Sequence, residues 1–396
     1  MRLPWQVHIK FFILADFLLL CIHYFLFVLK IFLFFLLFSG CTSSPSASAV
    51  CQEVIAPVTD TVSLVFAGDV MGHSLQITGA WQDGGDSCYH YHPVFQWVKD
   101  YFSAADIAVA NLEVTLAGAP YEGYPRFSSH QSLAGALHDV GFNVLLNANN
   151  HALDRYKRGM ERTLDVLDSI GMLHTGTFRD SSEWEAHYPL MIEKKNFRIA
   201  LLNYTYSTNG IPVEKPNIVN FIDTLRMFAD LAKTRDLKPD YIITCIHWGE
   251  EYNNNENATQ RELATFLARN GCNLVVGSHP HVVQPLEMLS VGNNEAVPVA
   301  YSLGNFVSNQ RDRYRNGGIT LELTLTKTDS LVTLQSIGYE PFWVYRYPVN
   351  KVPVFRLIPV NDYLEHPEHY PAISENDKKL MLQFYNDTKE IIEIPD

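Results

Sequence analysis

The sequence has little positive charge, and its basic residues form no stripe. The 396 residues include 30 Lys and Arg against 43 Asp and Glu, so the formal net charge is −13, and the two signs are mixed along the chain. Because proteins that bind nucleic acid present clustered cations to the phosphates, no nucleic-acid partner is expected. An acidic surface also repels a polyanion unless metal ions or local Arg and Lys residues intervene.

Cysteine is scarce, and none of the six cysteines forms a CxxC pair. The sequence therefore indicates neither a disulfide scaffold nor a thiolate zinc site. Cys245 and Cys272 lie in apolar runs, where a free thiol behaves as a small hydrophobic group. A disulfide between two of the thiols stays open, since the compartment inferred below permits it. Internal repeats are also absent from the sequence.

Charged residues make up only 18% of the chain, whereas apolar residues make up 47%. This balance is typical of an ordered globular protein and excludes a disordered one. The length allows one or two domains, and either number leaves enough chain for a sizeable core.

The N-terminus contains the longest apolar run, Phe11–Phe38, which few polar residues interrupt. With Lys30 as the positive flank and Ile31–Phe38 as the apolar region, Leu37–Cys41 resembles a bacterial lipobox. The resemblance implies cleavage before Cys41 and acylation of its thiol, with the preceding residues as a signal or, before Lys30, as a start-site artefact. An uncleaved anchor helix is the alternative. Either reading places the following domain outside the cytoplasm, anchored to the membrane of the cell envelope.

Residues 42–60 are rich in small residues and are expected to form a flexible tether. Beyond residue 60, short apolar runs alternate with helical patterns. The expected strands are Ser63–Ala67, Ile107–Ala110, Val144–Leu146, Ile199–Leu202, Tyr241–Ile246, Leu274–Val276 and Val297–Tyr301. The expected helices are Pro93–Phe102, Ser132–Val140, Met160–Ile170 and Thr259–Asn270. This alternation predicts parallel βαβ units in one α/β domain over residues 61–310.

Residues 311–396 have a different pattern and are predicted to pack on the same domain as a β-rich extension. Ile319–Leu325, Leu331–Ile337 and Val352–Leu357 have strand character without helices between them. We expect antiparallel strands that either extend the sheet or form a second one. A terminal helix is expected over Glu375–Asn386.

Polar side chains follow six of the apolar runs, at the point where each strand is expected to end. Because the carboxyl ends of parallel strands face one edge of a sheet, these side chains should gather there. His279 and His281 are two residues apart, so in an extended segment both imidazoles reach the same cluster. Carboxylate, imidazole and amide oxygen together suit Mn²⁺, Fe or Zn²⁺, and the candidates exceed what one ion needs. They are Asp69, Asn111, Glu113, Asn150, His151, His247, His279, His281 and Asn305.

The motifs at these strand ends resemble those of the CapA family, the capsule or poly-γ-glutamate synthesis proteins. The resemblance covers residues 62–308, and the six motifs occur in order. The family in turn resembles calcineurin-like metallophosphoesterases. It implies a metallophosphatase-like α/β fold, a four-layer sandwich of two mixed β-sheets flanked by helices. The motifs are Gly68-Asp69-Val70-Met71, Asn111-Leu112-Glu113, Asn149–Asp154, His247–Tyr252, Gly277–Val282 and Tyr301–Phe306.

The resemblance implies two divalent metal ions and one acid. Asp69 and His281 would bind the first ion, and Glu113 would approximate the bridging carboxylate, with Asn111 as its rival. The second ion would take Asn150, His247 and His279, and His151 would protonate a leaving group or stabilise charge.

Two motifs depart from the phosphoesterase pattern. Met71 stands where phosphoesterases have a His, which leaves the first ion a ligand short. His73 either fills this gap or is a loop histidine. Asn-Leu-Glu replaces Gly-Asp in the second motif, so metal loading and activity do not follow from the fold alone.

Residues beside the motifs are candidates for contacts to the substrate. Trp248, Glu251, Tyr252 and Asn305 are expected to shape a pocket, although an aromatic beside a strand end often serves packing instead. The three arginines near the third motif either contact an anionic substrate or form surface ion pairs; they are Arg126, Arg155 and Arg158.

Three functions fit this sequence. The first is a metal-dependent hydrolase or transferase, phosphoesterase-like, that acts on an anionic envelope polymer or its precursor during synthesis, export or attachment. The second is a non-catalytic accessory subunit that holds polyanionic chain in the same pocket. The third is a hydrolase with an unrelated small substrate. The membrane and polymer ligase or exporter subunits are the expected partners.

Overall fold

The computed structural model describes residues 59–292 and 295–392. The expected signal segment, Cys41 and residues 42–58 of the expected tether lie outside these residues. Within them, no helix combines the length and the apolar character that a membrane span requires.

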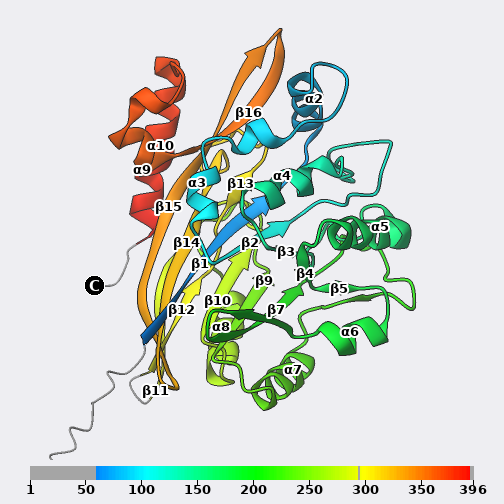
Figure 1. Cartoon of the computed structure of the whole chain (residues 1–396), viewed down its shortest axis with the longest axis vertical. Helices are drawn as coiled ribbons and strands as arrows, with labels where there is room; N and C mark the ends of the chain where they lie inside the picture. Colours follow the sequence, from blue (N-terminus) through cyan, green and yellow to red (C-terminus); the bar gives the residue numbers. More distant parts are fainter. Residues whose placement is uncertain (1–58, 293–294, 393–396) are drawn as a thin grey trace, which may run out of the picture. The chain divides into compact units, whose positions relative to one another are not determined.

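Two β-sheets form the centre of the described region (Figure 1). In the first sheet, four strands run parallel and are followed on one side by three antiparallel strands. The parallel strands are β1 (Thr59–Val70), β2 (Ile107–Leu112), β3 (Val144–Leu146) and β4 (Leu173–Thr175). The antiparallel strands are β14 (Gly317–Thr328), β15 (Leu331–Val349) and β16 (Val352–Pro359), and the short β13 (Asn305–Val307) pairs in parallel with the end of β1.

The second sheet has six strands, with a parallel centre and an antiparallel strand at each edge. Its central strands are β7 (Phe197–Thr205), β9 (Tyr241–His247), β10 (Leu274–Ser278) and β12 (Glu295–Ala300). Its edge strands are β6 (Leu190–Lys194) and β11 (Leu286–Gly292). A separate two-stranded ribbon joins β5 (Thr177–Phe178) to β8 (Ile218–Val219).

The two sheets pack face to face, because strands of both sheets contribute to one buried cluster. Leu64 and Phe66 of β1 share this cluster with Ile199 and Leu201 of β7 and Ile243 of β9. These strands are buried along almost their whole length, as expected for parallel strands covered on both faces.

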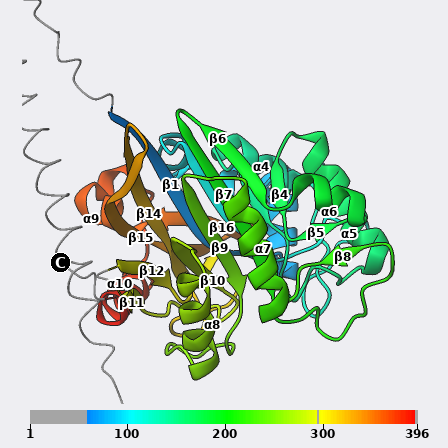
Figure 2. The same cartoon turned by 90° about the horizontal axis from the view of Figure 1, so that it is seen from below.

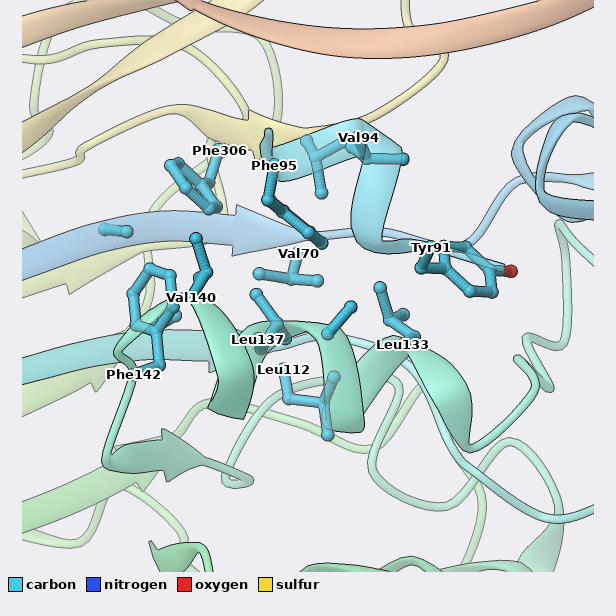
Figure 3. Close-up of a cluster of buried hydrophobic side chains, with 14 of the residues drawn as sticks. Val70, Tyr91, Val94, Phe95, Leu112, Leu133, Leu137, Val140, Phe142 and Phe306 are labelled. Carbon is cyan, nitrogen blue, oxygen red and sulfur yellow. The ribbon is translucent and has the colours of Figure 1, made fainter. Parts of the chain in front are cut away.

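Helices cover the outer faces of the two sheets. α2 (Ser74–Asp83), a 3-10 helix (His92–Phe95), α3 (Lys99–Ser103) and α4 (Ser132–Val140) share a cluster with the first sheet. Figure 3 shows Leu133, Leu137 and Val140 of α4 beside Val70 and Leu112, the last buried residues of β1 and β2. This packing fixes the strand ends from which the functional residues emerge.

The outer face of the second sheet is covered by α7 (Thr224–Asp236) and α8 (Ala258–Arg269) (Figure 2). α6 (Ser181–His187) contributes Trp184 at the margin of the same cluster. The order helices, sheet, sheet, helices confirms the expected mixed α/β four-layer sandwich. The remaining helices are α5 (Tyr156–Ser169), α9 (Val360–Glu365), a 3-10 helix (Pro367–His369) and α10 (Glu375–Ile391).

Beyond residue 310 the strands extend the first sheet, which was one of the two expected arrangements. β14 pairs with β1 from Thr59↔Thr328 to Ala67↔Thr320. Successive side chains of β15 then point to opposite faces. Phe342 packs in the cluster of α4, whereas Trp343 packs against Met381 and Phe384 of α10.

Local patterns predicted several elements closely and one wrongly. β3 and α4 have the predicted bounds. The single helix predicted over Pro93–Phe102 is wrong, because a turn separates the 3-10 helix from α3. At Val98 the backbone leaves helical geometry (φ −115°, ψ 2°), and this β-branched side chain is fully buried.

Candidate metal centre

The first sheet brings two buried carboxylates to the carboxyl end of its parallel strands. Asp69 lies near the end of β1, and Glu113 follows β2 directly; neither side chain is exposed. Gly68 makes the approach possible, because a Cβ at this position would lie 2.0 Å from the carbonyl oxygen of Gly304. The Asp69 N–H donates to that same oxygen at 2.9 Å, which joins the end of β1 to the start of β13.

The second sheet supplies three buried histidines. His247 ends β9, and His279 and His281 follow β10, which ends at Ser278. The expected extended segment is wrong here, since His279 (φ 102°) and His281 (φ 58°) both adopt positive φ values. Such conformations cost about 1–3 kcal/mol each in a non-glycine residue and occur mainly where the surrounding structure enforces them.

Direct contacts join the two sets of side chains. Asp69 Oδ2 lies 3.0 Å from His281 Nδ1, and Asp69 Oδ1 accepts a hydrogen bond from Asn111 Nδ2 at 2.8 Å. Asn150 Oδ1 lies 2.9 Å from His247 Nε2. Residues predicted as ligands of one ion are therefore neighbours in space, although they come from different sheets.

Two buried groups of three side chains have ligand atoms within 4.8 Å of one another, and both include Glu113. One group joins Glu113 to Asp69 and His281, and the other joins it to His247 and His279. Glu113 Oε1 and His279 Nδ1 are buried without a hydrogen-bond partner in the described residues. Since buried polar atoms are nearly always satisfied, these two atoms point to a missing cationic ligand.

Asn111, the rival for the bridging place, lies behind the carboxylates. Its Nδ2 donates to Asp69 and, at 3.2 Å, to Glu113 Oε2, while its Oδ1 accepts from Asn149 Nδ2 at 3.1 Å. The side-chain oxygen of Asn111 is therefore already bonded. This arrangement orients the two carboxylates.

The protonation states of the histidines differ. Burial lowers the pKa of His247 to about 3 and that of His279 to about 2, so both imidazoles are neutral and able to bind a metal. Burial also opposes the charge on His281, but Glu113 and Asp69 raise its pKa to about 9.

The two carboxylates also differ. Burial would raise the pKa of Asp69, yet the hydrogen bond to His281 and the charge of this residue lower it to about 2. Burial and the neighbouring Asp69 raise the pKa of Glu113 well above its usual value. Without a cation, two buried carboxylates this close cannot both ionise at low cost.

His151 is held by a buried carboxylate. Its Nδ1 lies 2.8 Å from Asp154 Oδ2, which also accepts the Phe127 N–H at 2.6 Å. Asp154 thereby orients the imidazole, and the second ring nitrogen of His151 has no hydrogen-bond partner among the described residues. Asp154 lies within the third motif, but the sequence did not predict this role for it.

A cavity of about 340 Å³ leads to this side of the centre. Asn150 and His151 line it, together with Glu251 and Tyr252, which were predicted to shape a substrate pocket. The other lining residues are Tyr124, Pro125, Arg126, Asp154, Asn209 and Ile211.

Trp248 and Asn305 lie outside this lining. Trp248 is buried in the core, and its indole N–H donates to the Tyr301 carbonyl oxygen at 2.9 Å, so it serves packing. Asn305 is buried as well, and its Nδ2 donates to the carbonyl oxygens of His281 at 3.2 Å and Arg315 at 2.9 Å. Asn305 therefore stabilises the turn that carries His281.

His73 belongs to neither ligand group. Its Nδ1 lies 3.0 Å from Gln76 Oε1 and accepts the Asn309 N–H at 3.3 Å, at the start of α2. Burial lowers the pKa of His73 to about 4. Of the two readings left open for His73, the geometry favours a loop histidine that begins a helix.

Two neighbours of the histidines, Ser278 and Tyr206, were not predicted from the sequence. Ser278 Oγ lies 2.9 Å from His247 Nδ1, and the ring of Tyr206 lies 4.6 Å from that of His279. Tyr206 directly follows β7, so a search for polar residues at the carboxyl ends of the strands would have identified it. Ser278 lies within the motif that contains His279.

Residues 63–310, more than half of the chain, match the family described as bacterial capsule synthesis protein PGA_cap. The chain is 28% identical over 289 residues to the PGA biosynthesis protein CapA of Bacillus subtilis, covering 72% of this chain and 71% of that protein. It is 26% identical over 280 residues to the capsule biosynthesis protein CapA of Bacillus anthracis, covering 65% of this chain but only 63% of that protein.

Among solved structures, the chain is similar to the calcineurin-like phosphoesterase YfkN of Bacillus subtilis. The identity is 12%, the TM-score is 0.45, and the match covers 84% of this chain and 99% of that one. The match with the family model, which spans all six motifs, carries the assignment: the chain belongs to the PGA_cap family of bacterial capsule synthesis proteins.

Proposed function

We propose that this protein is a metal-dependent hydrolase or transferase that acts on a capsular polymer of the poly-γ-glutamate type, or on its anionic linkage, during synthesis, export or attachment. The observation that carries the proposal is the pair of buried ligand groups that share Glu113. A structural metal site is closed around one ion, whereas two groups beside a cavity suit an open catalytic centre.

The side chains fit two divalent cations of the Mn²⁺, Fe or Zn²⁺ kind. Asp69 and His281 would hold one ion, His247, His279 and Asn150 the other, and Glu113 would bridge them. The unpaired Glu113 Oε1 and His279 Nδ1 are the atoms that such ions would satisfy. When bound, two such ions lower the pKa of a water molecule and stabilise negative charge on a substrate oxygen.

His151 supplies the proton chemistry in this proposal. Asp154 contacts its Nδ1, so the imidazole keeps one orientation. Because His151 also lines the cavity, its free nitrogen is available to a leaving group there. Asn150 precedes His151 in the sequence and contacts His247, so His151 lies next to the ligand groups.

Membrane attachment and partners extend this proposal. A lipid on Cys41 would hold the domain at the outer side of the membrane. The expected tether ends before residue 59, because Thr59 and Asp60 already pair with β14 in β1, and residues 42–58 would let the domain reach a growing polymer. The anionic polymer or its precursor and polymer ligase or exporter subunits are the proposed partners. The small-residue composition of the tether and the lipobox resemblance support this arrangement.

Metal content of the purified protein tests the proposal. We expect close to two equivalents of transition metal in the wild type and a clear loss in the variant that combines His279→Ala with His281→Ala. A variant that combines His138→Ala with His187→Ala removes two exposed histidines and should keep the metal. Protein that stays metal-free after incubation with Mn²⁺ and Zn²⁺ would exclude the catalytic reading.

A second experiment separates the enzyme from a non-catalytic accessory subunit. Met71 stands where phosphoesterases have a His, and this missing ligand favours the accessory role. For the enzyme, His151→Ala should lower the rate of hydrolysis of a phosphodiester or a γ-glutamyl polymer about 100-fold or more, with unchanged metal content. For the accessory subunit, His151→Ala should leave polymer binding intact, and no turnover should be detected in the wild type either.

A further inference from the structure

The cavity beside the metal centre carries one charge of each sign. Arg126 comes from the segment between β2 and α4, and Glu251 comes from the segment after β9; both line the cavity. Neither side chain takes part in an ion pair among the described residues, and they do not pair with each other. Two unlike charges that line one cavity without pairing are complementary to a ligand that carries both a negative and a positive group.

Two neighbouring arginines are already paired with carboxylates, and Arg158 does not line the cavity. Arg155 pairs with Glu122 at 2.6 Å, and Arg315 pairs with Asp312 at 3.0 Å. Arg315 also lies over the ring of Tyr252, at 3.8 Å from its centroid. The surface-ion-pair reading therefore holds for Arg155, whereas Arg126 keeps its guanidinium free of acidic partners in the region that the structure describes.

Aromatic contacts hold Arg126 in place. Its guanidinium donates to the hydroxyl of Tyr156 and lies 5.1 Å from the centroid of the same ring. A guanidinium fixed in this way retains donors for a planar carboxylate, which it binds in a bidentate manner. Tyr124, which lines the same cavity, is 78% exposed and adds an aromatic wall.

Glu251 lines the cavity beside Tyr252. Besides burial, its charge raises the pKa of Tyr252 to about 12. Glu251 is exposed and is therefore available to a cation that enters the cavity.

We propose that the cavity selects a substrate unit with both an ammonium and a carboxylate group, which means a single amino acid, a very short peptide, or a chain end whose terminal residue keeps both groups free. Arg126 takes the carboxylate, and Glu251 takes the ammonium. A purely polyanionic segment would meet repulsion from Glu251, and a neutral glycan would leave both charges desolvated without a partner. This inference rests on the proposed function, since it assigns the substrate class of the same site.

Three dipeptide probes test the proposal: alanylalanine, N-acetylalanylalanine and alanylalanine amide. Binding is measured by titration calorimetry on the metal-loaded full-length protein. In the wild type, we expect the free dipeptide to bind at least 10-fold more tightly than either derivative. Glu251→Gln should abolish the preference over the acetylated probe alone, and Arg126→Gln the preference over the amide alone.

Matched controls are Glu250→Gln and Arg158→Gln, which alter exposed charges next to the same segments but outside the cavity lining. Both should retain the two preferences. Three results would each overturn the proposal. The wild type could bind the acetylated probe equally or more tightly, the preferences could survive in the Glu251 and Arg126 variants, or metal-loaded protein could bind no probe at all. Metal content is measured on the same samples. Protein that takes up no metal would contradict the proposed function, whereas metal-loaded protein without the two preferences would contradict this inference alone.

Discussion

At the scale of single residues, the metal centre depends on a glycine as much as on its ligands. Gly68 precedes Asp69 and lets the end of β1 approach the backbone of Gly304. The atoms that an added Cβ would meet belong to the backbone, so no side chain can move aside to relieve the clash. The position of the Asp69 carboxylate therefore depends on Gly68, which has no side chain.

Gly68→Ala should therefore destabilise the protein by about 2–4 kcal/mol, since the two strand ends have to separate. The free energy of unfolding, measured with urea, checks this expectation. Gly135→Ala is the control, because Gly135 lies in α4 and an added Cβ there would meet no atom within 4 Å. It should stabilise by about 0.5–1 kcal/mol, as Ala favours helix over Gly. A Gly68→Ala variant as stable as the wild type would contradict the close approach.

At the scale of elements, the junction of β15 with α9 contains a titratable carboxylate. Glu340 of β15 accepts hydrogen bonds from the Asn361 N–H at 2.9 Å and from Asn361 Nδ2 at 2.6 Å. Burial raises the pKa of Glu340 to about 7, because these hydrogen bonds offset only part of the desolvation. In the folded state Glu340 therefore holds its proton to a higher pH than in the unfolded chain, where its pKa is near 4.5.

The free energy of unfolding should depend on pH because the pKa of Glu340 is raised in the folded state. The stabilisation from the bound proton is complete below about pH 4.5 and is lost as the pH rises to about 7. Glu340→Gln should thus raise the free energy of unfolding relative to wild type more at pH 8 than at pH 5, by on the order of 2 kcal/mol. Denaturant unfolding at both pH values measures it, with the exposed Glu185→Gln as control. An identical effect of Glu340→Gln at the two pH values would disprove the assignment.

At the scale of the whole molecule, the proposed ligands come from both sheets. Asp69 and Glu113 belong to the first sheet, and His247, His279 and His281 belong to the second. Bound cations would therefore connect two sheets that otherwise associate through apolar side chains. Metal binding should act on global stability and not only on the local loops.

Divalent metal at about 100 times its dissociation constant should raise the free energy of unfolding by about 2.7 kcal/mol. A chelator should reverse the increase, and the variant with His279→Ala and His281→Ala should show none. Thermal unfolding in Mn²⁺ or Zn²⁺, with Mg²⁺ as a harder cation for comparison, provides the measurement. A transition temperature that responds to neither metal nor chelator would show that no cation joins the sheets.

The sequence by itself determined the elements and the chemistry of their ends. Apolar runs such as Val144–Leu146 and the stop at Gly141 after α4 are local signals, so strands and helices could be predicted from them. The family motifs added the sandwich fold and the identity of candidate ligands. These features could be predicted because a strand or a turn is encoded by the few neighbouring residues that form it.

Only the tertiary structure decided which of these residues meet. The sharing of Glu113 between two histidine groups depends on two sheets that pack across a long sequence separation, which no local pattern encodes. The burial of Trp248 and the positive φ values of His279 and His281 were decided in the same way. Non-local packing fixed the backbone at these positions, and it also left Arg126 and Glu251 unpaired in one cavity.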